Sequence, residues 1–286
     1  MTTPTTEGAG HASEPRSPRA APMSEGGSAS VSESTSSPAT PGSTPPAVVV
    51  TVPTYNESQN ILPLVRELLA LGPGFAVVVI DDHSPDGTWK LVEDAARTEP
   101  RLHLIHRAQD KGRGRSGRDG FVRALEMGAR VVIEMDADFS HQPRYIPQMI
   151  RVLNGSNPPV GLVLGSRGAP GGRDADRGLA RQWITKLANL YIRLFLGVAV
   201  RDCNSGFRAW KRSTLEAIRV QETFSPGPAI VQELLFKTAR AKIGIAEVPI
   251  EFQNRLHGES TLTLRLLLQG YVAVLRLRWL SLTGRL

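Results

Sequence analysis

Residues 131–141 read Val-Val-Ile-Glu-Met-Asp-Ala-Asp-Phe-Ser-His, a short apolar run that ends in two aspartates and a polar loop. An apolar, β-branched run of this length predicts a strand that is buried on both faces. In α/β proteins with parallel sheets, ligands bind beyond the carboxyl ends of such strands. This stretch therefore predicts an α/β fold with a binding site in the loop that follows the strand.

Further apolar runs lie on both sides of this stretch, separated by segments with a helical pattern. Continuous apolar strands that alternate with helices predict a mostly parallel sheet with helices on both faces. Polar loops follow four of the five strands, so these loops should meet at one edge of the sheet. The other strands are predicted at 48–52, 76–80, 102–105 and 161–164, and the helices near 59–71, 88–98, 117–128 and 143–153.

The first 46 residues differ in composition from the rest of the chain. They are mostly Ser, Thr, Pro, Gly, Ala and Glu, with almost no large apolar side chain. Segment 1–46 is predicted to be disordered, because it cannot bury enough surface to offset its ordering entropy. It also lacks the basic start and apolar core of a secretory signal. The single cysteine, Cys203, excludes an internal disulfide and fits a reducing compartment.

The chain is basic, with a formal net charge of +7. Segment 1–46 contributes more glutamates than arginines, so the excess of positive charge lies in the remainder. A basic excess suits nucleic acid, a phosphate-bearing substrate or an acidic membrane surface, and charge alone does not choose among them. The carboxylates that follow the strands argue against nucleic acid, because they would repel its phosphate backbone.

The C-terminal segment 262–286 is predicted to form an amphipathic helix. Its apolar residues are interrupted by Arg265, Arg276 and Arg278, so it does not form a span of uncharged residues long enough to cross a bilayer. The periodicity leaves two interpretations open. The helix either packs on the domain or lies in a membrane interface.

Asp136 and Asp138 are the first candidates for chemistry. An isolated Asp-X-Asp pattern is commonly a solvated turn, but this one follows a buried strand at the edge where ligands bind. Two carboxylates one residue apart can share a hard divalent cation that keeps sites open for phosphate oxygens. Such a cation would neutralise charge on a leaving diphosphate. Both carboxylates are expected to be exposed, and therefore to add little to fold stability.

Two other segments carry polar groups with chemical capacity. Asp81 and Asp82 are adjacent carboxylates at a strand end, and a nucleotide base or ribose hydroxyl would explain both; Asp86 and Thr88 suit a turn and helix cap. Residues 111–118, Lys-Gly-Arg-Gly-Arg-Ser-Gly-Arg, open a predicted helix and suggest a phosphate cradle. This loop is not a P-loop, because the lysine precedes the glycines. An RGG-like contact with nucleic acid is the alternative, although no aromatics are interleaved.

Taken together, these motifs resemble a known family. Residues 52–57, 81–88, 136–141 and 165–167 occur in the order seen in glycosyltransferase family 2. More closely, the chain is similar to the polyprenyl-phosphate (dolichol-phosphate) mannose synthases. Two segments carry this narrower match: Asp202-Cys-Asn-Ser-Gly-Phe-Arg208 and residues 247–260. The resemblance covers about residues 48–261.

The resemblance implies a GT-A (Rossmann-like) catalytic domain over 47–261, followed by the C-terminal helix over 262–286. It implies transfer of mannose from GDP-mannose to a polyprenyl phosphate, with Mg²⁺ or Mn²⁺ as cofactor. It further implies a cytoplasmic protein, peripheral at the cytoplasmic face of the membrane, that uses the membrane surface and a membrane-anchoring partner protein.

The resemblance also assigns site residues by their position in the motifs. Those implied for the nucleotide sugar are Pro53, Tyr55, Glu57, Ile80, Asp82, Asp136, Ala137, Asp138 and Arg255. Those implied for the metal are Asp136, Asp138 and Ser140, and those implied for catalysis are Asp136, Asp138 and Arg167. Those implied for the acceptor phosphate are Arg167, Arg181, Thr185 and Arg255.

A lipid phosphate is already ionised near neutral pH, so it needs no general base to attack the sugar. The protein must instead bring two anions together, which arginines do well through bidentate contacts. Arg181 and Thr185 lie on the amphipathic stretch 181–196, which could equally be an ordinary core helix.

Two departures from the family pattern are visible. Thr261 stands where the family usually has lysine, and the 111–118 loop holds more arginine than the usual Gly-Leu-Gly version. The first departure leaves open another nucleotide sugar, such as UDP-glucose, or a glycan acceptor.

Overall fold

The computed structural model describes residues 46–174, 179–253 and 264–284. Within these ranges the side chains of 179–182, 184 and 264–269 are not described. Segment 1–46, apart from Pro46, therefore lies outside the described residues, as do Arg255 and Thr261.

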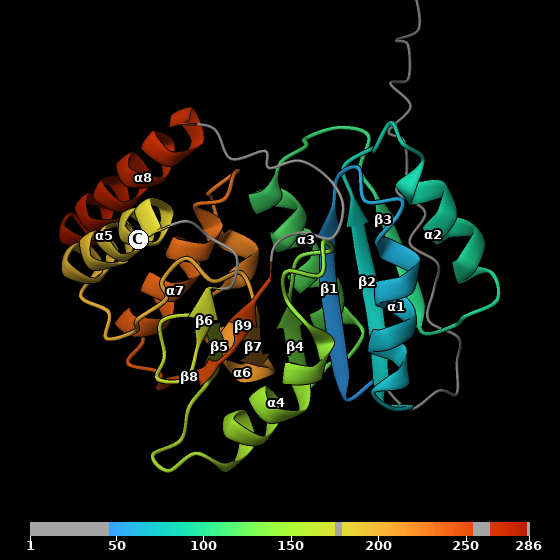
Figure 1. Ribbon diagram of the computed structural model, residues 1–286, viewed down its shortest axis with the longest axis horizontal. Coiled ribbons are helices and arrows are strands. Elements are labelled where there is room, and N and C mark those ends of the chain that lie inside the picture. The colour runs from blue at the N-terminus through green and yellow to red at the C-terminus, as the bar shows by residue number, and fades with distance from the viewer. Residues whose placement is uncertain (1–45, 175–178, 254–263, 285–286) are drawn as a thin grey trace, which may run out of the picture. The chain divides into compact units, whose positions relative to one another are not determined.

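A seven-stranded sheet forms the centre of the described chain, in the order β3–β2–β1–β4–β7–β5–β8 (Figure 1). Neighbouring strands are parallel except at β7, which runs antiparallel to both β4 and β5. The predicted mostly parallel sheet is therefore confirmed. The strands are β1 Val48–Thr54, β2 Phe75–Asp81, β3 Leu102–His106, β4 Val131–Glu134, β5 Leu162–Ser166, β7 Arg208–Lys211 and β8 Ile245–Pro249. A separate two-stranded sheet pairs β6 Arg173–Asp174 with β9 Glu251–Phe252.

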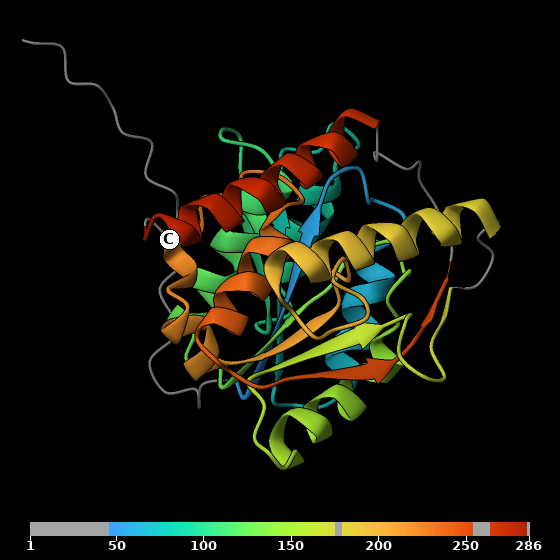
Figure 2. The same cartoon turned by 90° about the vertical axis from the view of Figure 1, so that its left-hand side faces the viewer.

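Helices cover both faces of the large sheet (Figures 1 and 2). One face packs against α1 Ile61–Ala70, α2 Thr88–Ala96 and α4 Ile146–Gly155, which follows the 3₁₀ turn η1 Pro143–Tyr145. The other face packs against α3 Arg113–Glu126, α5 Leu179–Leu196, α7 Ile230–Arg240 and α8 Leu264–Leu282. The short elements α6 Arg212–Ala217 and η2 Val220–Glu222 lie on that second face.

The central strands β1, β2 and β5 are largely apolar because alternate residues enter two different cores. On β1, Val49 packs with the α3 side, whereas Val50 and Val52 pack with the α1 side. All three side chains are fully buried. Strands covered on one face only would show alternating polar and apolar residues. The apolar runs therefore predicted the burial as well as the strands.

Helix α3 begins at Arg113, four residues before the start that the apolar pattern predicts. The extra turn contains Gly114, and a side chain there would collide with the backbone of the loop at Ser225–Gly227. The backbone N–H of Gly114 donates to the carbonyl of Pro226 at 3.0 Å. The turn is held by this direct backbone contact and not by an apolar face, so periodicity could not detect it.

Helix α8 packs on the domain and also presents an apolar outer side. Val274 and Leu277 are buried against the core shared with α5 and α7. Trp279 on the opposite side is 53% exposed. The two interpretations of the C-terminal helix are thus compatible with one helix. Among the described residues, no helix combines the length and the hydropathy needed to cross a bilayer.

Candidate active site

The polar loops after β1, β2, β4 and β5 come together at one edge of the sheet, as the parallel arrangement predicts (Figure 1). The register pairs Pro53 with Ile80 and Thr54 with Asp81, so the first two loops leave the sheet side by side. Backbone N–H groups of the first loop donate to side chains of the second: Asn56 to Ser84 Oγ at 3.0 Å and Glu57 to Thr88 Oγ1 at 2.9 Å, and Ser58 to Asp86 Oδ2 at 3.0 Å.

Asp81 is a buried anchor for its own loop. Its carboxylate accepts hydrogen bonds from Thr54 Oγ1 at 2.8 Å, from Ser84 Oγ at 2.6 Å and from the Ser84 N–H at 2.8 Å. These donors satisfy the carboxylate without any ligand. The sequence suggested that a nucleotide group would be needed to explain Asp81, but Thr54 of β1 and Ser84 of the loop supply the partners.

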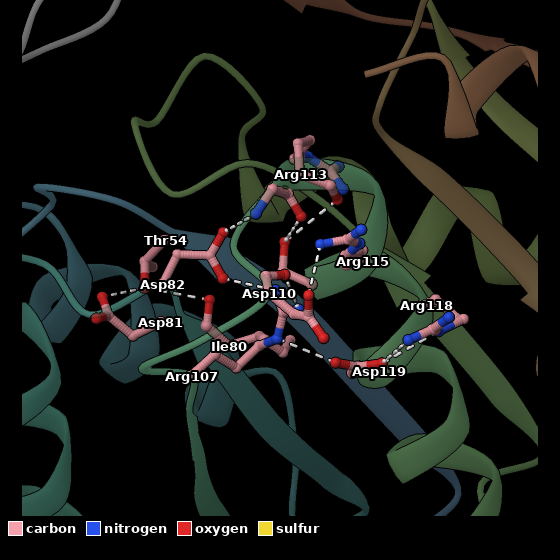
Figure 3. Close-up of polar contacts among 12 residues, drawn as sticks. Thr54, Ile80, Asp81, Asp82, Arg107, Asp110, Arg113, Arg115, Arg118 and Asp119 are labelled. Atoms are coloured by element: carbon pink, nitrogen blue, oxygen red, sulfur yellow. Dashed lines mark hydrogen bonds and ion pairs between the residues drawn. The ribbon is translucent and has the colours of Figure 1, made fainter. Parts of the chain in front are cut away.

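Asp82 points the other way and is held by a cation from the next strand. Arg107, directly after β3, places Nη1 2.6 Å from Asp82 Oδ1, and the Gly112 N–H donates to Asp82 Oδ2 at 2.7 Å. Arg107 also pairs with Asp119 of α3 through Nε at 3.0 Å (Figure 3). The adjacent carboxylates avoid repulsion because each has its own donors. Sequence reasoning missed Arg107, although a charged residue at this edge was a usable signal.

Asp136 and Asp138 differ in exposure. The Asp136 side chain is 42% exposed, whereas Asp138 is only 3% exposed. The expectation that both are exposed is therefore wrong for Asp138. Ser140 explains the difference, because its hydroxyl donates to Asp138 Oδ1 at 2.5 Å and its N–H donates to the same oxygen at 3.1 Å. In this geometry Ser140 orients Asp138.

His141 contacts the backbone of the same loop. The Asp136 N–H donates to His141 Nδ1 at 3.3 Å, so this nitrogen acts as an acceptor. Burial lowers the pKa of His141, and the nearby carboxylates of Asp136 and Asp138 only partly oppose this. The ring stacks on Phe207 at a centroid distance of 5.2 Å. A neutral, packed imidazole therefore fixes the backbone at Asp136.

Arg113 lies beside the exposed carboxylate of Asp136. Its Nη2 is 2.9 Å from Glu134 Oε1 and 3.5 Å from Asp136 Oδ1. Burial alone would lower the pKa of Arg113, but Glu134 and Asp136 outweigh it and the pKa is raised. Sequence reasoning placed this arginine in a phosphate cradle. In the structure it is paired with carboxylates.

The rest of the 111–118 loop is also engaged with acidic groups. Arg115 pairs with Asp110 at 2.9 Å and Arg118 with Asp119 at 3.1 Å (Figure 3). Lys111 is exposed. Most of the positive charge of the loop is therefore compensated within the protein, which argues against a cradle that meets phosphate with several free cations.

Arg167, after β5, forms a bidentate pair with the buried carboxylate of Asp202. Nε and Nη2 of Arg167 lie 2.7 Å and 2.8 Å from the two Asp202 oxygens. Burial would raise the pKa of Asp202, but Arg167 lowers it below its ordinary value. Burial likewise opposes the raised pKa of Arg167, to which Asp202 contributes most and Asp136 contributes as well. Arg167 is thus within electrostatic reach of Asp136.

Arg208 fixes the loop that carries Asp202. This fully buried guanidinium donates to the carbonyls of Ser205 at 2.8 Å and Val231 at 2.7 Å. Burial lowers the pKa of Arg208 to about 10, so it stays charged near neutral pH. The sequence showed this arginine only as the end of a motif. Its role is to tie the 202–207 loop to α7.

The candidate acceptor residues are only partly described. Thr185 is half-buried on α5, the side chain of Arg181 on the same helix is not described, and Arg255 lies outside the described residues. Helices α5 and α8 pack side by side (Figure 2), and the Tyr191 hydroxyl donates to the Tyr271 carbonyl at 3.2 Å.

The outer sides of these two helices form one apolar surface, which we call the α5–α8 face. Trp183 and Leu194 on α5 are 63% and 72% exposed. Its exposed members are Trp183, Leu187, Leu190, Leu194, Phe195, Val272, Leu275, Trp279 and Leu282.

The donor set at Asp136 and Asp138 fits a divalent cation that binds together with a diphosphate. Among the described residues, no group of three or more His, Cys, Asp or Glu could hold a metal by itself. Mg²⁺ in particular is commonly bound through one or two carboxylates, with substrate phosphates and water completing the shell. Gly206 leaves room for this, since a Cβ there would lie 3.6 and 3.7 Å from the Asp136 oxygens.

Comparison with known proteins identifies the family. The sequence profile described as glycosyl transferase family 2 matches residues 49–219. The chain is 36% identical over 243 residues to the undecaprenyl-phosphate mannosyltransferase of Micrococcus luteus, which covers 84% of this chain and 98% of that protein. It is 35% identical over 216 residues to the polyprenol monophosphomannose synthase of Mycolicibacterium smegmatis, which covers 75% of this chain and 80% of that protein.

A solved structure supports the fold. Glucosyl-3-phosphoglycerate synthase from Mycobacterium tuberculosis, in complex with Mn²⁺, UDP-glucose and glycerol 3-phosphate, superposes with a TM-score of 0.58 at 21% identity. The match covers 82% of this chain and 79% of that one, and it confirms the expected GT-A architecture. The motifs, the arrangement of their side chains and the two mannosyltransferase relatives lead to one conclusion: the chain belongs to glycosyl transferase family 2.

Proposed function

We propose that the protein transfers a mannosyl group from GDP-mannose to a polyprenyl phosphate, with Mg²⁺ or Mn²⁺ as cofactor. The observation that carries the proposal is the Asp136–Asp138 pair at the carboxyl edge of the sheet, in a chain 36% identical to an undecaprenyl-phosphate mannosyltransferase over 98% of that protein. The donor and the acceptor are both phosphate esters, so one site must accommodate two anions.

The donor half is formed by the first two loops and the β4 loop. Pro53, Tyr55 and Glu57 line the nucleotide from β1, and Ile80 and Asp82 line it from β2. Asp82 is pre-oriented, because Arg107 and the Gly112 N–H already fix both of its oxygens. Asp136, Ala137 and Asp138 receive the diphosphate end, where a bound divalent cation offsets the charge that develops on the leaving GDP.

The acceptor half uses Arg167, Arg181, Thr185 and Arg255. Asp202 holds Arg167 rigidly, so the guanidinium keeps its position when an anion approaches. The acceptor phosphate oxygen forms a bond to the anomeric carbon of mannose as the bond from that carbon to the diphosphate breaks. GDP leaves with the electron pair, and the configuration inverts. No proton needs to be removed, which agrees with a site built from carboxylates and arginines.

The α5–α8 face is the proposed membrane contact. Its exposed tryptophans suit the interfacial region of a bilayer, and Lys186, Arg193, Arg276 and Arg278 are exposed on the same two helices. These cations would favour an anionic surface. We propose that the protein is peripheral at the cytoplasmic face of a membrane, with a membrane-anchoring partner protein as a further contact.

The proposal is tested with the full chain and labelled sugar donors. GDP-mannose and UDP-glucose are each incubated with polyprenyl phosphate in anionic vesicles and Mg²⁺ or Mn²⁺, and label in the lipid fraction is measured. We expect transfer from GDP-mannose only, and loss of transfer with EDTA. Transfer from UDP-glucose alone, or transfer only to a glycan acceptor, would contradict the proposal.

A further inference from the structure

The dipeptide Gly112–Arg113 at the start of α3 touches both halves of the donor site. The Gly112 N–H donates to Asp82 Oδ2 at 2.7 Å, and Arg113 Nη2 lies 3.5 Å from Asp136 Oδ1. Asp82 follows β2 and Asp136 follows β4, so the dipeptide bridges two loops from different strands. A brace of this kind fixes the relative position of the two carboxylates.

The guanidinium of Arg113 occupies a slot that two glycines leave open. A Cβ at Gly117, one turn further along α3, would lie 3.0 Å from Arg113 Nη1. On the other side, a Cβ at Gly206 would lie 3.8 Å from Arg113 Nη2, beside the Asp136 oxygens. A Cβ at Gly117 would therefore crowd the guanidinium, whereas a Cβ at Gly206 would make ordinary van der Waals contact with it and with Asp136.

One nitrogen of Arg113, Nη2, lies close to two carboxylates. Nη2 contacts Glu134 at 2.9 Å and Asp136 at 3.5 Å, while Nη1 is buried and makes no hydrogen bond. Glu134 Oε2 is also buried without a hydrogen-bond partner. The Arg113–Glu134 pair is thus not a closed bidentate pair. Glu134 holds the Arg113 guanidinium at a distance from Asp136 that allows only a weak ion pair between Arg113 and Asp136.

We propose that Arg113 is a positioning residue that shares Asp136 with the divalent cation, and that Glu134 sets how strongly it competes. This inference rests on the proposed function, which assigns the cation to Asp136 and Asp138. In the wild-type protein, Arg113 interacts mainly with Glu134, so Asp136 remains a good metal ligand. When Glu134 is replaced by glutamine, the guanidinium turns to Asp136 and opposes the cation.

The decisive variant is Glu134→Gln. It keeps the shape of the side chain and an oxygen for Arg113 Nη2, but it removes one negative charge from beside the site. A unit charge a few ångströms from a divalent cation changes its affinity by about tenfold or more, even with strong screening. We expect the Kd for Mn²⁺, measured calorimetrically on the full chain in the presence of GDP, to rise about tenfold.

The second variant, Arg113→Leu in the Glu134→Gln background, separates competition from structural damage. It removes the uncompensated cation and leaves a neutral pair in the slot. We expect the Kd for Mn²⁺ to return to the wild-type value or below it, although the disturbed orientation of Asp136 keeps kcat low. A merely structural role predicts that the second substitution weakens Mn²⁺ binding further.

Arg115→Leu is the matched control, because Arg115 lies in the same turn and pairs with the exposed Asp110. It should leave the Kd for Mn²⁺ within twofold of the wild type. Thermal melting checks that all variants are folded. A Glu134→Gln protein with wild-type Mn²⁺ affinity overturns the role of Arg113 while the proposed function stands. A wild-type protein that binds no Mn²⁺ with GDP overturns the metal site itself, and this inference with it.

Discussion

Two acidic motifs lie at the same edge of the sheet. Their sequences are similar, but their carboxylates differ in burial and in hydrogen-bond partners. Asp81 and Asp82, after β2, are both buried and each has strong donors within 2.8 Å. In the β4 loop, the Asp136 side chain is 42% exposed and its contact with Arg113 is 3.5 Å long. An ionised carboxylate that is already saturated builds structure, whereas an exposed one can take a cation. The difference in partners, and not the sequence pattern, separates a scaffold from a reactive group.

The largest expected effect comes from the exposed carboxylate. Asp136→Ala should lower kcat about a thousandfold, which corresponds to roughly 4 kcal/mol of lost transition-state stabilisation through the cation. Its thermal stability should stay near that of the wild type, because the side chain is 42% exposed and Arg113 keeps Glu134 as its partner. Transfer kinetics and a melting curve measure the two quantities. An Asp136→Ala enzyme with near wild-type kcat would show that Asp136 does not contribute to the reaction.

Asp82→Asn should show the opposite balance. It removes the negative charge from the buried pair with Arg107. Losing one member of such a pair lowers the free energy of unfolding by about 3 kcal/mol. We expect a lower free energy of unfolding in urea and weaker GDP binding, without a specific change in Mn²⁺ dependence. Asp119 remains as a partner of Arg107, so Asp119→Asn serves as the comparison variant. Unchanged stability in Asp82→Asn would show that the pair with Arg107 adds nothing to the fold.

Asp202 extends the comparison to acid pH. Its pKa is lowered in the folded protein because Arg167 outweighs the effect of burial, so the group stabilises the fold above its unfolded pKa. That contribution is lost as the pH falls from about 4 through the folded pKa. Asp202→Asn should therefore be less stable at pH 7, by about 2 kcal/mol. Its stability should also depend less on pH below 4 than that of the wild type, as followed by urea unfolding across pH.

Sequence patterns predicted the parts of the molecule that repeat a simple rule. Five strands were predicted from apolar runs: β1, β2, β4 and β5 are buried on both faces, whereas β3 at the edge of the sheet is only partly buried. The meeting of their loops follows from the parallel arrangement. Strand β7 was not predicted, since it begins with the fully buried Arg208, whose partners are the backbone carbonyls of nearby Ser205 and of Val231 on α7. Arg107 and Arg113 were not assigned their partners for the same reason. A pairing between residues on different elements leaves no local pattern.

The position of Asp138 shows a second limit of sequence reasoning. The motif places it correctly in the loop after β4, but its burial depends on Ser140 folding back onto the carboxylate. Spacing identifies which groups share a loop, and it does not tell which oxygen atoms are already bonded. The candidate site was therefore predictable as a set of residues and not as a set of available ligands.

The smallest expected effect belongs to Asp81, and it tests the scaffold interpretation most directly. Asp81→Asn keeps one acceptor oxygen, but its amide nitrogen replaces the oxygen that takes the hydroxyls of Thr54 and Ser84. The cost should be about 1 kcal/mol, the typical worth of such hydrogen bonds. Because the Asp81 carboxylate is fully used inside its loop, kcat and the Kd for Mn²⁺ should change less than threefold. A large change in Mn²⁺ affinity with unaltered stability would mean that Asp81, too, faces the ligand.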